Sequence, residues 1–213
     1  MELYNYGRSS ASFRVRIALE LKGLTYDYRS VDLVGGEQFG EAFGALSRVP
    51  LVPLLVDGDA RIAQSMAIIE YLDETHPEPP LLPGSALERA RIRSLALDIA
   101  CEIHPLNNLR VLRHLVREMG MTEAAKDTWY RHWVEQGLAA VDRRLAGEPQ
   151  TGRFCHGETP TLADCLLVPQ IFNARRMDCR LDHVPTVMRV FDACMALPAF
   201  QRAQPSACPD FKP

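Results

Sequence analysis

The chain has 213 residues, of which 47% are hydrophobic and 24% are charged, and 24 basic against 27 acidic side chains give a net charge of −3. These values exclude disordered and collagen-like chains, and the absence of a basic excess argues against nucleic acid as a partner. Because no apolar run could cross a bilayer and the N-terminus lacks the apolar core of a signal peptide, we expect no membrane partner and a cytoplasmic location.

The first 33 residues predict a strand, a helix and a second strand. Residues 2–6 alternate like a short strand, and residues 13–22 carry apolar side chains at helical spacing. Gly23 is suited to end this helix, and residues 26–33 mix aromatic and β-branched side chains as strands do. A strand–helix–strand order predicts two parallel strands joined by a right-handed crossover.

An antiparallel hairpin is predicted farther along the chain. Residues 51–56 are apolar, Asp57-Gly58 is a turn signal, and residues 61–64 form the returning strand. Pro53 stands at the start of this hairpin, where a proline in the trans form would occupy a position of the strand without donating a hydrogen bond to its neighbour. We therefore expect a cis Val52–Pro53 bond, although cis is the minor form of such bonds.

Helical segments flank the hairpin and fill the rest of the chain. Residues 38–46 precede the hairpin, and Ser65 is expected to cap a helix over residues 66–74. Four prolines in residues 76–84 indicate a linker. Beyond it the periodicity predicts helices over 85–118, 122–146, 161–177 and 186–196, the third of which opens with a Thr161-x-x-Asp164 capping pattern.

These elements predict two domains. Residues 1–75 form an α/β domain of order βαβ-α-ββα, residues 76–84 link it to the next, and residues 85–213 form an all-helical domain. The six cysteines are irregularly spaced, so no disulfide framework is expected. Cys101 and His104 are three residues apart on a predicted helix, but two ligands do not complete a metal site, which usually takes four. We expect no metal.

Two predicted helix N-termini are candidate anion sites. The first is the turn that holds Arg8 and the serines at positions 9, 10 and 12, and the second is Gln64-Ser65. Backbone N–H groups and the helix dipole favour negative charge at both places. The alternative is that these serines are only N-caps, which is the commonest use of serine there.

Six motifs, in order along nearly the whole chain, resemble the zeta-class glutathione transferases. This class includes maleylacetoacetate isomerases and the related bacterial glutathione-dependent maleylpyruvate isomerases. The resemblance implies the glutathione transferase fold, with a thioredoxin-like domain before a helical one. The motifs are Ser9-Ser10-x-Ser12-x-Arg14-Val15-Arg16, Gly35-Gly36-x-Gln38-Phe39, Gln64-Ser65-x-Ala67-Ile68, Pro105-Leu106-x-Asn108-Leu109 and Thr161-Leu162-Ala163-Asp164, with Leu51-Val52-Pro53 before the third.

The resemblance also implies where glutathione binds. The serines would lie near its sulfur, Val52 with Pro53 would pair with the cysteinyl backbone, and the other positions would hold the γ-glutamyl end or add contacts. The implied contacts are Ser9, Ser10, Gln38, Val52, Pro53, Gln64, Ser65, His104 and Asn108. Ala11 replaces the usual cysteine of the zeta class, so no thiol of this chain can act there. We expect Ser9 and Ser10 to be the catalytic residues.

Three arginines are candidates for holding a dianionic substrate. Arg8 lies beside the serines, Arg110 follows Asn108, and Arg176 falls where zeta isomerases carry an arginine. The guanidinium fork matches a carboxylate, although each of these arginines could equally form a solvated salt bridge. His104 and Arg110 together resemble the maleylpyruvate branch, and His104 could bind glutathione, move a proton near neutral pH, or only pack before Pro105.

The sequence therefore predicts a glutathione-dependent cis–trans isomerase of a maleyl keto acid, in the breakdown of aromatic compounds. Glutathione would be its cofactor and a small dicarboxylic keto acid its substrate. The preferred substrate is maleylpyruvate, with maleylacetoacetate close behind. Two other functions are open: a transferase that conjugates electrophilic or halogenated acids, and a non-catalytic binding module. The resemblance implies a homodimer.

Overall fold

The computed structural model describes residues 1–211, which divide into two compact units. The first holds Met1–Leu82 and the segment from Met195 onward, and the second holds Pro83–Cys194. The division after Leu82 falls within the predicted linker. The C-terminal segment, however, groups with the first unit and not with the helical domain to which the sequence assigned it, because helix α9 (Pro198–Ala203) packs against helix α1 (Ser10–Leu21).

A four-stranded sheet lies at the centre of the first unit. Its strands are β1 (Glu2–Asn5), β2 (Asp27–Ser30), β3 (Leu54–Asp57) and β4 (Ala60–Ala63). Their order is β2-β1-β3-β4, with β1 parallel to β2 and the other neighbours antiparallel. The predicted parallel pair, the hairpin and the cis Val52–Pro53 bond are all confirmed. Strand β3 begins only at Leu54, because Pro53 has no N–H for a ladder bond.

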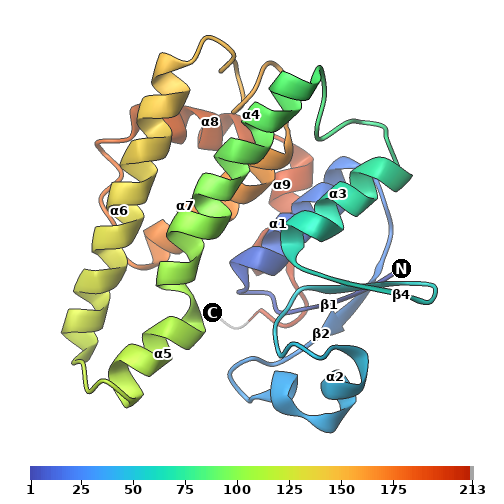
Figure 1. Ribbon diagram of the computed structural model, residues 1–213, viewed down its shortest axis with the longest axis vertical. Coiled ribbons are helices and arrows are strands. Elements are labelled where there is room, and N and C mark those ends of the chain that lie inside the picture. Colours follow the sequence, from blue (N-terminus) through green and yellow to red (C-terminus); the bar gives the residue numbers. More distant parts are fainter. Residues whose placement is uncertain (212–213) are drawn as a thin grey trace. The chain divides into compact units, whose positions relative to one another are not determined.

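Helices cover both faces of this sheet (Figure 1). Helices α1 and α3 (Ser65–Thr75) pack against each other on one face, and α2 (Glu41–Leu46), preceded by the 3-10 turn η1 (Glu37–Phe39), lies on the other. Alternation along the strands supplies both cores. Leu3 and Leu55 are fully buried, whereas Leu54 of the opposite face packs with Phe43 of α2.

The second unit is helical. Its elements are α4 (Ala86–Leu97), a π-helical turn η2 (Asp98–Ile103), a 3-10 turn η3 (His104–Asn107), α5 (Leu109–Arg117), α6 (Glu123–Gly147), α7 (Leu162–Arg176) and α8 (Pro185–Met195). Helix α4 packs against α7, and α6 packs against η2. Within residues 1–211, no helix combines the length and the apolar character that crossing a bilayer requires.

The prediction of one helix over residues 85–118 is wrong. The α-helical path stops after Leu97 and continues as the π-helical and 3-10 turns, and α5 begins at Leu109. Pro105 explains why no α-helix continues through the 3-10 turn, because it has no N–H to donate to the carbonyl of Cys101 and its ring crowds the preceding turn. The capping pattern at the start of α7 acts as expected, since the Asp164 carboxylate accepts the N–H of Thr161 at 2.8 Å.

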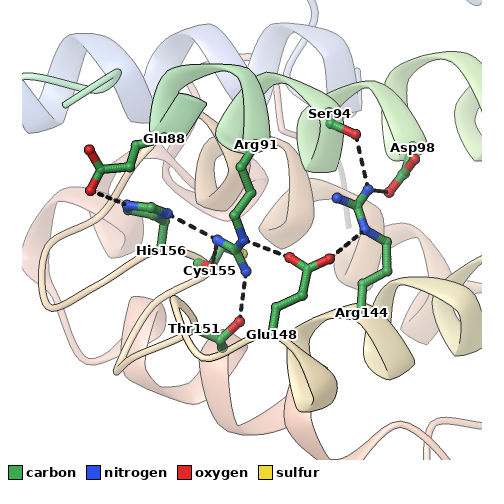
Figure 2. Close-up of polar contacts among 9 residues, drawn as sticks. All are labelled: Glu88, Arg91, Ser94, Asp98, Arg144, Glu148, Thr151, Cys155 and His156. Carbon is green, nitrogen blue, oxygen red and sulfur yellow. Dashed lines mark hydrogen bonds and ion pairs between the residues drawn. The ribbon is translucent and has the colours of Figure 1, made fainter. Parts of the chain in front are cut away.

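An ion-pair network ties α4 to the end of α6 in the second unit (Figure 2). Arg91 donates to Glu148 at 2.6 Å, to Thr151 at 2.9 Å, and to the Cys155 carbonyl and the His156 ring at 3.0 Å each. Arg144 joins the same Glu148 to Asp98. Burial raises the pKa of the Glu148 carboxyl, but the hydrogen bonds from the two arginines outweigh it and hold that pKa below its usual value. These ion pairs and hydrogen bonds hold α4 against the segment at the end of α6.

Candidate functional site

The first predicted anion site lies at the N-terminus of α1. This helix begins at Ser10, three residues before the predicted start, and Ser9 is its N-cap. The Ser9 Oγ accepts the N–H of Ser12 at 3.2 Å, so the expected capping role is confirmed. A cap of this kind uses a lone pair of the oxygen and leaves the hydroxyl proton available to a second partner. Capping and ligand binding are therefore compatible at Ser9.

Buried Arg16 holds the turn that leads into this helix. Its guanidinium donates to the carbonyl of Gly7 at 3.0 Å, to the Asn5 side chain at 3.0 Å and to the Ala203 carbonyl at 2.9 Å. The sequence placed Arg16 within a motif and suggested no role for it. The signal was an arginine on a helix face that the apolar pattern buries, since a buried charge needs several partners.

The second predicted anion site lies at the N-terminus of α3. Gln64 precedes this helix with φ 72° and ψ 116°, a strained backbone conformation of the kind that often marks functional sites. The prediction that Ser65 caps the helix is wrong, because Ser65 is the first helical residue and Gln64 occupies the cap. The Ser65 hydroxyl oxygen instead accepts a hydrogen bond from the guanidinium of Arg14 at 3.2 Å.

The Arg14–Ser65 bond brings α1 and the start of α3 together. Both side chains are buried, with 3% and 6% of their surface exposed, so a positive charge lies under the N-terminus of α3. Helix N-termini already favour anions, and a neighbouring guanidinium strengthens that preference. Arg14 is the second residue for which the sequence suggested no role.

The segment before β3 leaves peptide groups unused. Within residues 1–211, neither the N–H nor the C=O of Val52 takes part in a hydrogen bond. Gln38, on η1, is 6% exposed, and its side-chain Oε1 has no partner in the same part of the chain. An extended peptide pairs its backbone with such groups. Together with the two helix N-termini, these groups fit a small acidic peptide such as glutathione.

In the second unit, His104 and Asn108 are brought together. The Asn108 Oδ1 accepts the Arg110 N–H at 3.1 Å and caps α5, so its amide nitrogen faces the His104 Nε2 at 3.1 Å. Because an amide nitrogen only donates, the His104 Nε2 accepts this hydrogen bond, which requires the neutral imidazole with its proton on Nδ1. The Trp129 indole holds the same turn by donating to the Leu106 carbonyl at 2.9 Å.

Helix α6 connects this turn with the end of α7. Trp129 contacts η3, and the next residue, Tyr130, donates to the Asn173 carbonyl at 3.4 Å. The Arg176 guanidinium donates to the Asn173 side chain at 3.4 Å. Burial raises the pKa of the Tyr130 hydroxyl to about 12, and the charge of Arg176 acts in the opposite direction.

For the remaining predicted site residues, the structure gives a position and a degree of burial, and no hydrogen bond or ion pair links them to one another within residues 1–211. Arg8 and Arg110 are exposed, and within residues 1–211 neither guanidinium has an ion-pair or hydrogen-bond partner. Ser10 is buried in the first turn of α1, and Pro53 is buried before β3. The roles given to Ser9, Ser10, Gln38, Val52, Pro53, Gln64, Ser65, His104, Asn108, Arg8, Arg110 and Arg176 toward ligands stay predictions.

Two open cavities of the second unit lie apart from these residues. One, of about 560 Å³, is lined by Asp98, Glu102 and Arg144 among others, and the second, of about 600 Å³, by Arg131 and Glu135 among others. Neither is lined by a predicted site residue. The six cysteines are free, and no group of metal-ligating side chains is present within residues 1–211. The candidate site therefore lies at the helix N-termini of the first unit and not in either of these cavities.

Comparisons with known proteins agree with this geometry. A family model described as the glutathione S-transferase N-terminal domain matches residues 3–80. The chain is 45% identical to a probable maleylacetoacetate isomerase of Vibrio cholerae, over 98% of this chain and 97% of that protein. It is 47% identical to a zeta-class maleylpyruvate isomerase of known structure, with a TM-score of 0.97 and full coverage of both chains. A maleylacetoacetate isomerase from Methylobacterium extorquens AM1, solved with malonate and glutathione, is 38% identical, with a TM-score of 0.97 and full coverage of both chains.

Proposed function

Because the chain belongs to the zeta-class glutathione transferase family of maleylacetoacetate and maleylpyruvate isomerases, we propose that it is a glutathione-dependent cis–trans isomerase of a maleyl keto acid. Maleylpyruvate is the preferred substrate. The observation that carries the proposal is the identity of 45% and 47% to two such isomerases over nearly the full length of each chain. The geometry of the first unit supports it, because two helix N-termini joined through Arg14 suit a ligand with anionic groups.

Bound glutathione supplies a thiolate, which adds reversibly to the conjugated double bond and so permits rotation about it. The residues of this chain have to keep that sulfur ionised. An unperturbed cysteine thiol has a pKa near 8.5 and is only ~3% ionised at neutral pH. Lowering that pKa by about 2 units requires ~2.7 kcal/mol of differential stabilisation.

Ser9 and α1 can supply this amount. A helix N-terminus contributes about 0.3–1 kcal/mol, and up to ~2 kcal/mol where it is partly buried. A hydrogen bond from a hydroxyl to a charge adds about 1.5–3 kcal/mol. Ser9 is the better donor of the two serines because its oxygen accepts the Ser12 N–H, which leaves its hydroxyl proton available to another partner. The replacement of the family cysteine by Ala11 therefore leaves the chemistry intact.

Other groups hold the two ends of the tripeptide and the acid. Ser65 and the N–H groups of α3 would bind the γ-glutamyl carboxylate, and Val52 would pair with the cysteinyl backbone. Arg8, Arg110 and Arg176 stay the residues predicted to bind the carboxylates of the substrate, and the guanidinium groups of the first two have no partner within residues 1–211. A guanidinium also stabilises the enolate that develops as the double bond is attacked. Dimer formation and a cytoplasmic location stay predictions.

A turnover assay with a small amount of glutathione tests the proposal. The chain is mixed with excess maleylpyruvate, or with maleylacetoacetate in a parallel reaction, and both the cis acid and the total free thiol are followed. An isomerase converts many equivalents of acid per glutathione while the thiol concentration stays constant. Loss of one thiol per acid consumed would instead identify a conjugating transferase. Tight glutathione binding without turnover of either acid would indicate a binding module, and both of these results would overturn the proposal.

A further inference from the structure

The C-terminal segment of the chain returns to the turn that bears the serines. The carboxylate of Asp210 accepts the N–H of Gly7 at 3.0 Å and the hydroxyl of Ser30 at 3.0 Å through Oδ2. The hydroxyl of Tyr28 donates to its other oxygen, Oδ1. All four residues belong to the first unit. A residue near the C-terminus thus anchors both β2 and the start of the turn.

The peptide groups of Gly7 are held from two sides. Asp210 accepts the N–H, and the Arg16 guanidinium donates to the C=O at 3.0 Å. A Cβ atom on residue 7 would lie 2.7 Å from the Asp210 Oδ1 and 3.1 Å from the Cys208 Cβ. The tail therefore packs directly on the backbone of Gly7, with no room for a side chain. Only Arg8 separates this fixed point from Ser9.

The charge of Asp210 is maintained at neutral pH. Burial raises the pKa of its carboxyl, but the hydrogen bonds from Tyr28, Gly7 and Ser30 outweigh it and hold that pKa below its usual value. Hydrogen bonds to an ionised group are roughly twice as strong as those between neutral groups. The contact with Gly7 is thus of the stronger kind.

We propose that Asp210 is a positioning residue for the reaction, which holds the turn from Gly7 to Ser10 so that the Ser9 hydroxyl points at the sulfur of glutathione. This inference rests on the proposed function and adds to it a residue that does not touch the ligand. The physical basis is the steep dependence of catalysis on geometry, since a displacement of about 1 Å can cost ~100-fold in rate.

Two variants disturb this contact from opposite sides. Asp210→Asn keeps the shape of the side chain and removes its charge, and Gly7→Ala pushes the tail away while every charge remains. Ser30→Ala is the matched control, because it removes one hydrogen bond to the same carboxylate and leaves the bond to Gly7 in place. Asp59→Asn removes an exposed carboxylate elsewhere in the first unit and controls for net charge.

Both variants should lower kcat by roughly 10- to 100-fold, while the KM for glutathione changes less than about threefold because Ser65 and Val52 bind the tripeptide. Hydrogen exchange of the peptide covering residues 6–12 should be faster than in the wild-type protein. The two controls should keep kcat and this exchange rate within about twofold of wild type. The double variant should lose less than the product of the single losses, since both break one contact.

Unchanged exchange at residues 6–12 together with an unchanged kcat would overturn the inference, even if the variants melt at a lower temperature. So would a rise in the KM for glutathione at constant kcat, because this result would place Asp210 in tripeptide binding. The exchange measurement needs no ligand. Failure of the wild-type chain to isomerise either acid would thus count against the proposed function, whereas the exchange data would still decide whether Asp210 holds the turn.

Discussion

A single side chain, Ser9, has two uses that the sequence presented as alternatives. As the N-cap of α1, its oxygen accepts the Ser12 N–H. As a proposed thiolate donor, it uses the proton that the cap leaves available. Arg14 and Arg16 also combine two roles, because each buried guanidinium lies in the core and bonds to a part of the candidate site, Arg14 to the Ser65 hydroxyl and Arg16 to the Gly7 carbonyl. For these residues, the sequence motifs predicted that they lie at the candidate site, and the structure shows which groups they form hydrogen bonds with.

Replacing Ser9 with alanine should separate the two uses. Loss of the cap costs about 0.5–2 kcal/mol of unfolding free energy. Loss of the hydroxyl donor should lower kcat by roughly 10- to 100-fold and raise the pKa of the bound glutathione thiol. The kinetic loss is measured by the turnover assay, and the thiol pKa by the ultraviolet absorbance of the thiolate across a pH series.

Thr122→Ala is the matched control for this variant. Thr122 caps α6 in the second unit with a contact of the same length, 3.2 Å, from its oxygen to the Ala125 N–H. It should cost similar stability and leave kcat and the thiol pKa unchanged. Equal kinetic losses in the two variants, or a Ser9→Ala enzyme with wild-type kcat, would remove Ser9 from the role of thiolate donor.

The segment of the second unit between α4 and α5 shows how one element depends on another. Apolar periodicity through residues 85–118 predicted a continuous helix, yet the backbone changes to π-helical and 3-10 turns over residues 98–107. Pro105 interrupts the helical hydrogen bonds of this stretch although the apolar periodicity continues through it. The π-helical turn was not predictable from this stretch alone, because α6 packs against it and approaches it closely through a glycine.

Gly137 of α6 is that glycine. A Cβ atom there would lie 2.5 Å from the Cγ1 of Ile103, the last residue of the π-helical turn. The β-branched side chain of Ile103 cannot yield easily. Gly137→Ala should therefore lower the free energy of unfolding by about 1–3 kcal/mol through overpacking, as measured by chemical denaturation.

Gly147 is the last residue of the same helix, and a Cβ atom added there would meet no other atom within 4 Å. Gly147→Ala should raise stability by up to about 1 kcal/mol, since alanine loses less backbone entropy in a helix. Opposite signs in these two variants would establish that the contact with Ile103, and not helix propensity, requires the glycine at position 137. A stabilised Gly137→Ala protein would contradict the close approach of α6 to the π-helical turn.

Across the molecule as a whole, each unit contains a tyrosine whose ionisation opposes folding; Tyr26 of the first unit is half-buried, and Tyr130 of the second is buried. Burial raises the pKa of Tyr26 in the first unit and of Tyr130 in the second to about 12. An unfolded tyrosine has a pKa near 10. Between these values the unfolded chain loses a proton that the folded chain keeps, so stability falls as the pH rises from about 10 toward 12.

Tyr130→Phe should reduce this dependence. The hydroxyl makes a long bond of 3.4 Å to the Asn173 carbonyl and interacts with the Arg176 side chain, and loss of such contacts should change stability at pH 8 little. The further loss of unfolding free energy between about pH 8 and 11 should be smaller than in the wild-type protein. Urea denaturation at the two pH values measures the difference, and equal losses in both proteins would show that Tyr130 titrates normally.

Local sequence was enough to predict the order of strands and helices in residues 1–75, the hairpin with its cis proline, the capping box of Thr161 and Asp164, and the family, and it offered Ser9 as an N-cap. The structural features among these depend on residues a few positions apart, whose periodicity, turn chemistry and capping act before the chain has folded. Only the folded chain shows that Arg14 meets Ser65, 51 positions away, and that Asp210 meets Gly7, 203 positions away. Such pairs form only when tertiary packing brings distant segments together; it buries the Arg14 guanidinium, which then needs a partner, and it brings the C-terminal segment onto Gly7.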